Sequence, residues 1–324
     1  MALPTLKNHL HRMLFKSKRL GISGFTLLEL LVAMIVAGIV VSGLLYVIVE
    51  LLQIDRRESI LDQTQRDMQR ALNYITDDIR EAVYIYDDPT TVATQLSDSP
   101  ARSVPILAFW RPDPVSNIPV CTLIADPIKK DECDVLRIRR SSYSLVIYFQ
   151  KTRDSNPNWL GRSRIIRYEL DKYSNMTTLA LTSGYQDPAS TDVSFSGWTR
   201  LGASTDGTKN VLVDFVDAPS TPYTKSPLSD SPPCSTLGAN YKLVPSTAAT
   251  TATPATSFFG CVRDPSPTIA DASGNGNQDA YLFLRGSIDG AGGSIGIRTG
   301  NDSSLPTLET RVLMRGVIDK TPTN

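Results

Sequence analysis

Histidine is nearly absent from this 324-residue chain, and its two copies, His9 and His11, both lie near the N-terminus. Everything after residue 11 therefore lacks the histidine that Ser-His or Cys-His catalysis and histidine-ligated zinc require. The sequence also shows no nucleophile motif and no paired-carboxylate motif. These absences argue against an enzyme and favour a structural or binding role.

Acidic residues are missing from the first 24 positions, which carry five basic ones: Lys7, Arg12, Lys16, Lys18 and Arg19. The positive-inside rule places such an end in the cytoplasm and the C-terminal bulk across the membrane. Without this leader the chain keeps 33 − 5 = 28 basic residues against 33 acidic ones, a net charge of −5. A mildly acidic exported domain argues against nucleic acid as a partner.

Charged residues and proline are both absent from the twenty residues at 30–49. At about 1.5 Å per residue this run forms a helix about 30 Å long, which matches the hydrocarbon core of a bilayer. Residues 30–49 are therefore predicted to span a membrane. Glu29 borders the run, where a carboxylate costs roughly 2.5–3.5 kcal/mol, so we expect a partner that neutralises it.

Small residues, Ser23 and Gly24, precede the apolar run. An ordinary secretory signal is cut after its apolar region, whereas a cut after Gly24 removes only the basic leader and leaves the helix in place. The new amine would belong to Phe25 and have a pKa of about 8, so in one subunit it could neutralise Glu29 of a neighbour. The alternative is an uncleaved signal-anchor helix with a chance glutamate.

The stretch GFTLLE that begins at Gly24, together with the apolar helix after it, resembles the type IV prepilin and pseudopilin signature. The resemblance covers roughly residues 20–52. It implies that a membrane-bound prepilin peptidase cuts after Gly24 and methylates the amine of Phe25, and that Glu29 is the assembly residue. It also implies three further partners: other pilins or pseudopilins through the helix, an inner-membrane assembly platform and the lipid bilayer.

Two features depart from many members of that family. The leader is long at 24 residues, and Met13 is an alternative start that would leave a shorter basic leader. The helix has no proline, whereas many major pilins carry one in its second half. The absence of proline favours a minor pilin or pseudopilin.

Beyond Leu52 an apolar stripe continues among charged residues at a spacing of seven. Its positions are Ile54, Leu61, Met68, Leu72, Ile75, Ile79, Ala82 and Tyr86. This pattern predicts that the helix continues in amphipathic form, with a domain-core contact favoured over a separate coiled-coil partner. Asp87, Asp88 and Pro89 are predicted to end it, because the residue before proline avoids the helical conformation. The expected helix thus covers residues 25–88.

From residue 100 onward, short apolar runs alternate with turn residues, which is typical of strands. The candidate strands are 104–110, 134–140, 145–149, 164–170, 211–216, 281–284 and 311–315. The predicted fold is α+β and pilin-like, with the long N-terminal helix packed on an antiparallel β-rich head at 89–324 that has room for one short helix. Proline-rich residues 217–234 and Ser/Thr/Ala-rich residues 246–257 are predicted flexible loops.

Cysteine occurs only four times, an even number that suggests disulfides in an exported domain. Three pairings are possible. Cys121–Cys133 with Cys234–Cys261 is favoured, because each pair closes a loop that contains turn-forming residues. The alternatives are free thiols or a four-cysteine zinc site, although the spacing typical of zinc ligands is missing.

A calcium loop is the one cofactor site suggested by the head sequence. Asp271, Ser273, Asn275 and Asp279 supply oxygen atoms at a spacing like the opening of such a loop, with Gly276 for a sharp turn. Leu282 stands where an EF-hand places its bidentate glutamate, so the match is incomplete. A plain Gly/Asn turn is the alternative.

Two other patterns favour ordinary structure. The glycine-rich residues 290–296 lack the spacing, the lysine and the helix of a phosphate loop, so a connection between strands is expected. Arg137, Arg139 and Arg140 form a basic cluster interleaved with acids, which is interpreted as a solvated strand face. A polysaccharide or partner contact is the alternative for this cluster.

The expected function is that of a minor pilin or pseudopilin in a type II secretion or type IV pilus-like machine. Its size and β-rich head resemble the J-type pseudopilins. Residues 119–127 and 308–315 resemble cyanobacterial pseudopilins of hormogonium polysaccharide secretion. The alternative from another class is a membrane-anchored exported domain that binds a ligand or carbohydrate.

Overall fold

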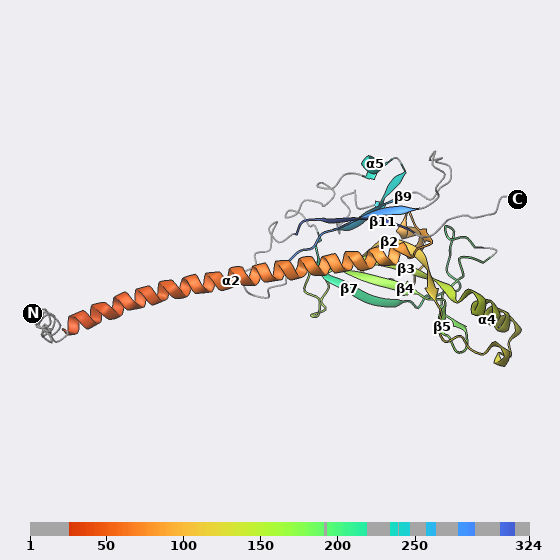
Figure 1. Cartoon of the computed structure of the whole chain (residues 1–324), viewed down its shortest axis with the longest axis horizontal. Coiled ribbons are helices and arrows are strands. Elements are labelled where there is room, and N and C mark those ends of the chain that lie inside the picture. Colours follow the sequence, from red (N-terminus) through yellow and green to blue (C-terminus); the bar gives the residue numbers. More distant parts are fainter. Residues whose placement is uncertain are drawn as a thin grey trace, which may run out of the picture. The chain divides into compact units, whose positions relative to one another are not determined.

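The computed structural model describes residues 26–190, 193–218, 234–238, 240–246, 257–263, 278–288 and 305–314. The chain divides into two compact units, Met1–Asp55 and Arg56–Asn324. The second unit, called the head below, contains all the strands of the described residues (Figure 1).

A single long helix, α2 (Leu27–Arg80), supplies residues to both units. Its N-terminal part is the one helix of the described chain that is long and apolar enough to cross a membrane. Within the head, Met68, Leu72, Ile75 and Ile79 of the predicted stripe are buried, whereas Ile54 in the first unit is 54% exposed. The stripe is therefore the face that packs into the head's own core.

Helix α2 ends at Arg80, earlier than the predicted end at residue 88. After Arg80 the backbone N–H of Ala82 donates to the carbonyl oxygen of Ile79, and the N–H of Val83 already pairs with Trp110 in the sheet. The residues that follow are β-branched or aromatic, which favours a strand. They form β1 (Tyr84–Ile85).

Pro89 begins a new helix instead of ending the old one. Asp88 caps α3 (Pro89–Ala93), and its side chain accepts a hydrogen bond from the backbone N–H of Thr90 at 3.0 Å. Proline suits the first position of a helix because its missing N–H has no partner there in any case.

Two antiparallel sheets make up most of the head (Figure 1). The first sheet has the order β1-β2-β3-β4-β7, with β2 (Ser103–Pro114), β3 (Ser141–Thr152), β4 (Ser163–Leu170) and β7 (Thr208–Val216). The second has the order β11-β10-β9-β8, with β8 (Tyr241–Val244), β9 (Phe258–Arg263), β10 (Asp279–Leu284) and β11 (Leu308–Leu313). The strands predicted at 104–110, 145–149, 164–170, 211–216 and 281–284 lie inside these elements, and 311–315 overlaps β11.

The main core gathers around the C-terminal part of α2. Buried side chains of the helix join those of both sheets, including Phe109 and Val146 from the first sheet and Leu282 and Val312 from the second. Ile75, at the centre of the helical contribution, has no exposed surface. The predicted α+β arrangement, a long helix packed on an antiparallel β-rich head, is confirmed.

A second core covers the opposite face of the first sheet. It is rich in aromatic residues, and the ring of Trp110 lies edge-on to those of Tyr185 and Trp198. The indole N–H of Trp110 donates to the hydroxyl of Tyr86 at 3.0 Å, so the buried polar atom has a partner. The first sheet is thus buried on both faces.

Buried glutamines connect the two sheets. The side-chain oxygen of Gln150 on β3 accepts hydrogen bonds from the backbone N–H groups of Ser257 and Phe258, both at 3.1 Å. Gln278 bonds both backbone groups of Ile85, at 2.9 Å and 3.0 Å. Because an unpaired buried amide is costly, these bonds specify how the sheets join.

The predicted strand at 134–140 is wrong, because these residues belong to α4 (Pro127–Arg139) and its C-cap. Asp126 caps this helix through a hydrogen bond from the N–H of Ile128 at 3.0 Å, and Pro127 stands at its start. Arg140 ends it in the left-handed conformation, at φ 52°. An alternation over seven residues was too short to separate strand from helix, and the Asp-Pro start signal was the better guide.

The hairpin of β5 (Tyr173–Asn175) and β6 (Ala180–Leu181) packs beside α4 (Figure 1). A short 3-10 helix, η1 (Cys121–Leu123), precedes α4, and α5 (Cys234–Leu237) precedes β8. Each of these short helices begins at a cysteine that forms a disulfide with another element of the head, α4 for η1 and β9 for α5.

Candidate functional site

The N-terminal turn of α2 holds the one predicted assembly residue that the structure describes. The backbone N–H of Glu29 donates to the carbonyl oxygen of Thr26 at 3.0 Å, and the Thr26 hydroxyl oxygen lies 3.4 Å from the same nitrogen. A carboxylate in the first turn faces the positive end of the helix dipole, which stabilises it by about 0.3–1 kcal/mol. Among the described residues no cation pairs with the Glu29 carboxylate.

The apolar side chains that follow Glu29 are exposed on every side of the helix. All residues at 26–59 are exposed, from Leu27 at 84% to Ile48 at 50% among the large apolar ones. A helix that is apolar all round must be covered by lipid or by other helices. Glu29 therefore stands at the edge of a surface that water does not favour, where a cation brought by a second chain would be strongly attracted.

Several predicted site residues fall outside the described part of the chain. Gly24 and Phe25, the predicted processing site, are among them, as are Asp271, Ser273 and Asn275 of the calcium interpretation. The glycine-rich residues 290–296 and nearly all of the predicted loops at 217–234 and 246–257 also lie outside it. The structure leaves these predictions untested.

Asp279, the last residue of the calcium interpretation, lies on β10 and has no exposed surface. Its carboxylate binds the guanidinium groups of Arg263 at 2.7 Å and Arg311 at 2.8 Å, and the hydroxyl of Tyr241 at 2.7 Å. These contacts join all four strands of the second sheet. Among the described residues no cluster of acids, cysteines or histidines is suited to hold a metal ion.

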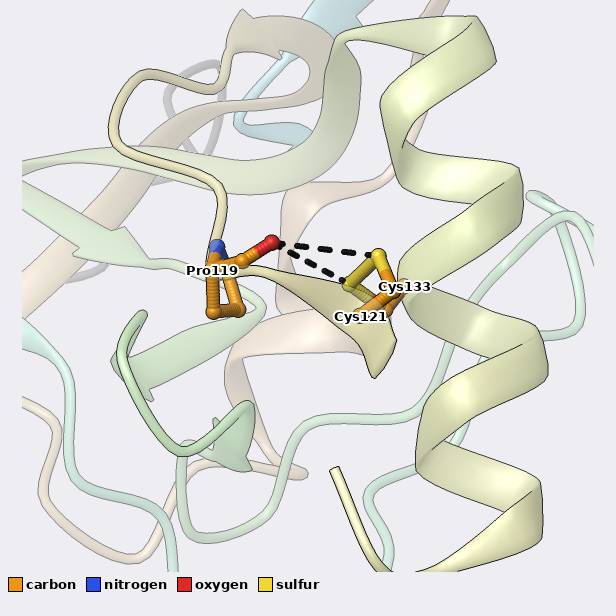
Figure 2. Close-up of a disulfide and its surroundings, with 3 residues drawn as sticks. All are labelled: Pro119, Cys121 and Cys133. Atoms are coloured by element: carbon orange, nitrogen blue, oxygen red, sulfur yellow. Dashed lines mark hydrogen bonds between the residues drawn. A yellow bond between two sulfur atoms is a disulfide. The ribbon is translucent and has the colours of Figure 1, made fainter. Parts of the chain in front are cut away.

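The two disulfides join Cys121 to Cys133 and Cys234 to Cys261, the pairing favoured from the sequence. Their Cα atoms lie 5.6 Å and 5.4 Å apart, within the usual range for a disulfide. Figure 2 shows the first disulfide, whose sulfur atoms lie 3.8 Å and 3.6 Å from the carbonyl oxygen of Pro119. The Cys121–Cys133 disulfide fastens η1 to the middle of α4.

Polar contacts fasten α4 to the β5–β6 hairpin on the same side as the disulfide. The hydroxyl of Tyr173 donates to Glu132 at 2.7 Å, and the ammonium of Lys172 binds Glu132 at 2.9 Å and Asp187 at 3.0 Å. Burial by itself lowers the pKa of Lys172, but the two carboxylates outweigh it and raise the pKa. Lys172 thus stays charged. Within the described residues, these contacts and the disulfide hold α4 against the head by one of its faces.

A groove runs between the C-terminal part of α4 and the loop before η1. It is lined by Val115, Ser116, Asn117, Ile118, Asp134, Arg137, Ile138 and Arg140. The basic cluster predicted on a strand face therefore surrounds a helix C-terminus, where cations are favoured by the helix dipole. No ion pair engages the side chains of Arg137, Arg139 or Arg140 within the described residues.

A buried charge network anchors α2 to the first sheet, and the sequence analysis did not find it. Asp78 of α2 accepts hydrogen bonds from the Tyr148 hydroxyl at 2.6 Å and the Arg167 Nε at 2.7 Å. Arg167 in turn binds Glu169, which also binds Arg111 at 2.9 Å. Asp78 lies three residues after Ile75 and four before Ala82 of the apolar stripe, and this spacing was the signal that the carboxylate is buried.

Glu169 makes this network sensitive to acid. Burial by itself raises the pKa of its carboxyl, but Arg167 and Arg111 outweigh burial and lower the pKa below the ordinary value. The folded pKa is thus below the unfolded value of about 4.3, so the stabilisation is complete above that pH and is lost as pH falls through the folded pKa.

We therefore expect acid to erase the stability difference between the native chain and a Glu169→Gln variant. Unfolding by urea at pH values from about 6 to about 3 measures this difference, which should shrink below pH of about 4.3. A difference that stays constant over this range would contradict the assignment.

Comparison with known proteins identifies one match. A family model described as the prokaryotic N-terminal methylation motif matches residues 20–45. These residues include the predicted cleavage site, Glu29 and most of the apolar run. No curated protein and no solved structure matches the chain.

Proposed function

We propose, from the premise that residues 20–45 carry the N-terminal motif of a type IV pilin-like prepilin, that this chain is a minor pilin or pseudopilin. It would be a structural, non-enzymatic subunit of a filament assembled from the inner membrane. The observation that carries the proposal is the helix that follows the motif, which is apolar on all sides, exposed, and has Glu29 in its first turn. In a filament the same helix would be covered by the helices of neighbouring subunits.

The proposed assembly pathway has three steps: membrane insertion, processing and incorporation into the filament. The basic leader at 1–24 keeps the N-terminus in the cytoplasm while residues 30–49 span the inner membrane and the head lies on the far side. The prepilin peptidase then cuts after Gly24 and methylates Phe25. The assembly platform draws the processed chain out of the bilayer, and Glu29 pairs with the amine of a neighbour.

The machine is a type II secretion system or a type IV pilus-like system. The helix without proline and the large head of two antiparallel sheets support a J-type pseudopilin or an equivalent minor pilin. The resemblance of residues 119–127 and 308–315 to cyanobacterial pseudopilins supports a polysaccharide as the secreted cargo. Two disulfides suit a head outside the cytoplasm, because disulfides persist in oxidising compartments.

The mature N-terminus tests this proposal directly. Mass spectrometry of the chain purified from membranes of its host is expected to show a protein that begins at Phe25 with a methylated amine. Gly24→Ala is the matched variant, and it should keep the leader because the peptidase no longer accepts the site. A native chain that retains its leader, or one that is cut after the apolar run, would overturn the assignment.

A further inference from the structure

The groove between the C-terminal part of α4 and residues 115–118 is large enough to hold a ligand. Its volume is about 790 Å³, within the range of roughly 300–1,000 Å³ that is usual for ligand pockets. The two walls are held together, because the backbone N–H of Val115 donates to the carbonyl oxygen of Arg140 at 2.9 Å and Ile118 packs against the small core around Cys133. A groove with fixed walls binds a ligand without a large cost for ordering the protein.

The lining of this groove offers both donors and acceptors of hydrogen bonds. The side chains of Arg137 and Arg140 only donate, the ionised carboxylate of Asp134 only accepts, and the amide of Asn117 does both. Within the described residues, none of these four side chains makes a hydrogen bond or an ion pair with another group. The lining therefore carries two positive charges and one negative charge, and its polar groups are open to a ligand.

The end of α4 decides which kind of anion suits the groove. The last carbonyl groups of a helix lack partners within it, and those of Arg137 and Ile138 accept no backbone hydrogen bond from the described residues beyond α4. These carbonyl oxygens and the carboxylate of Asp134 disfavour a bare anion such as phosphate or sulfate, but they accept hydrogen bonds from hydroxyl groups. A ligand that matches the lining thus has hydroxyl donors as well as a negative charge.

We propose that this groove binds a saccharide chain that contains uronic acid residues. Arg137 and Arg140 are three positions apart, so both guanidinium groups can donate to the carboxylate of one uronic acid residue. The ring hydroxyls donate to Asp134 and bond the amide of Asn117, and the C–H face of the ring covers Ile138, which is 85% exposed. This inference rests on the proposed function, because it names the kind of polysaccharide that the head binds as cargo.

An acidic peptide is the other ligand that two arginines in a groove could bind. Extended peptides commonly add a strand to the edge of a sheet, but all the residues that line this groove lie outside the strands. The carboxylates of such a peptide would also meet Asp134 and the negative end of α4 without the hydroxyl groups that satisfy them. The lining therefore favours a saccharide.

Binding of defined oligosaccharides to the full-length chain in micelles tests the proposal. The probes are trigalacturonate and triglucuronate, and an NMR titration that observes the ligand signals measures the Kd of each. At least one uronate is expected to bind, and to bind more tightly than its neutral counterpart, galactotriose or cellotriose, and than triglutamate, which carries carboxylates without ring hydroxyls. Absence of binding by both uronates, or equally tight binding of the neutral sugar or of triglutamate, would overturn the proposal.

Substitutions on α4 locate the binding site. The double change Arg137→Gln and Arg140→Gln is expected to raise the Kd of the uronate at least about tenfold, which corresponds to 1.4 kcal/mol. Arg139→Gln is the matched control, because Arg139 is exposed on the same turn but does not line the groove, and it should leave the Kd nearly unchanged. A double variant that binds as tightly as the native chain, or an equal loss from Arg139→Gln, would refute the assignment of the groove.

Both experiments use the unprocessed chain in micelles, so they do not depend on the peptidase. If the N-terminus in the host is methylated Phe25 but no uronate binds, the saccharide inference fails and the pilin-like function stands. If a uronate binds through Arg137 and Arg140 but the leader is retained in the host, the proposed function fails on its own.

Discussion

Replacing Glu29 with alanine is expected to prevent incorporation of the chain into filaments while leaving leader removal and membrane insertion intact. Glu29 stands at the edge of the apolar run with no cation partner within the described residues. Alanine removes a group that costs roughly 2.5–3.5 kcal/mol near hydrocarbon, so insertion is not weakened. What the variant would lose, on the proposed function, is the attraction to the amine of a neighbouring subunit, which is strong in a medium of low dielectric constant.

The measurement compares two fractions from cells of the host. Filaments released by shearing, or secretion of the cargo, should fall to background, whereas the membrane fraction keeps processed protein. Asp62→Ala is a matched control on the same helix, because Asp62 makes an exposed ion pair with Arg66 at 2.9 Å that is worth less than about 1 kcal/mol. Normal filaments from the Glu29→Ala variant would refute the pairing argument.

The features that could be predicted from the sequence are those set by nearby residues, namely the apolar run and the spacing of the apolar stripe. An apolar run of twenty residues without proline favours a helix in a membrane, because the helix pairs its own backbone groups, and the buried positions Met68, Leu72, Ile75 and Ile79 were visible from their spacing. The end of α2 could not be predicted in the same way. The competing strand at β1 exists because Val83 and Tyr86 find partners on β2, which is a tertiary contact.

Helix α4 is a second element that could not be predicted from local sequence alone. The alternation at 134–140 matched a strand, but a helix buries Cys133 and Leu136 together, and the disulfide to Cys121 holds that face against the head. Only the fold shows that the side chains of Ile128 and Ile138 remain exposed to solvent. Glu29 was thus identified as a candidate from the sequence and stays a prediction, whereas the exposed side of α4 could not be identified in that way.

Replacing Asp78 with alanine is expected to destabilise the head by about 3–5 kcal/mol, the usual cost of removing one partner of a buried ion pair. Asp78 is 7% exposed, and its loss leaves the Arg167 Nε and the Tyr148 hydroxyl without their acceptor. Burial and the neighbouring carboxylate raise the pKa of Tyr148 well above its ordinary value, so the hydroxyl remains a donor in need of a partner.

Urea unfolding of the full-length chain in micelles measures the change, because the buried Trp110 and Trp198 report on the head. Asp77→Ala is the matched control one residue away. Asp77 pairs with Arg80 at the surface, with 71% of its side chain exposed, so this change should cost less than about 1 kcal/mol. Equal effects of the two substitutions would show that the network does not hold α2 in place. We expect Asp78→Ala to destabilise the head and Asp77→Ala to leave it stable, with leader removal intact in both variants. That result would show that anchoring of the head and processing of the N-terminus depend on separate parts of α2.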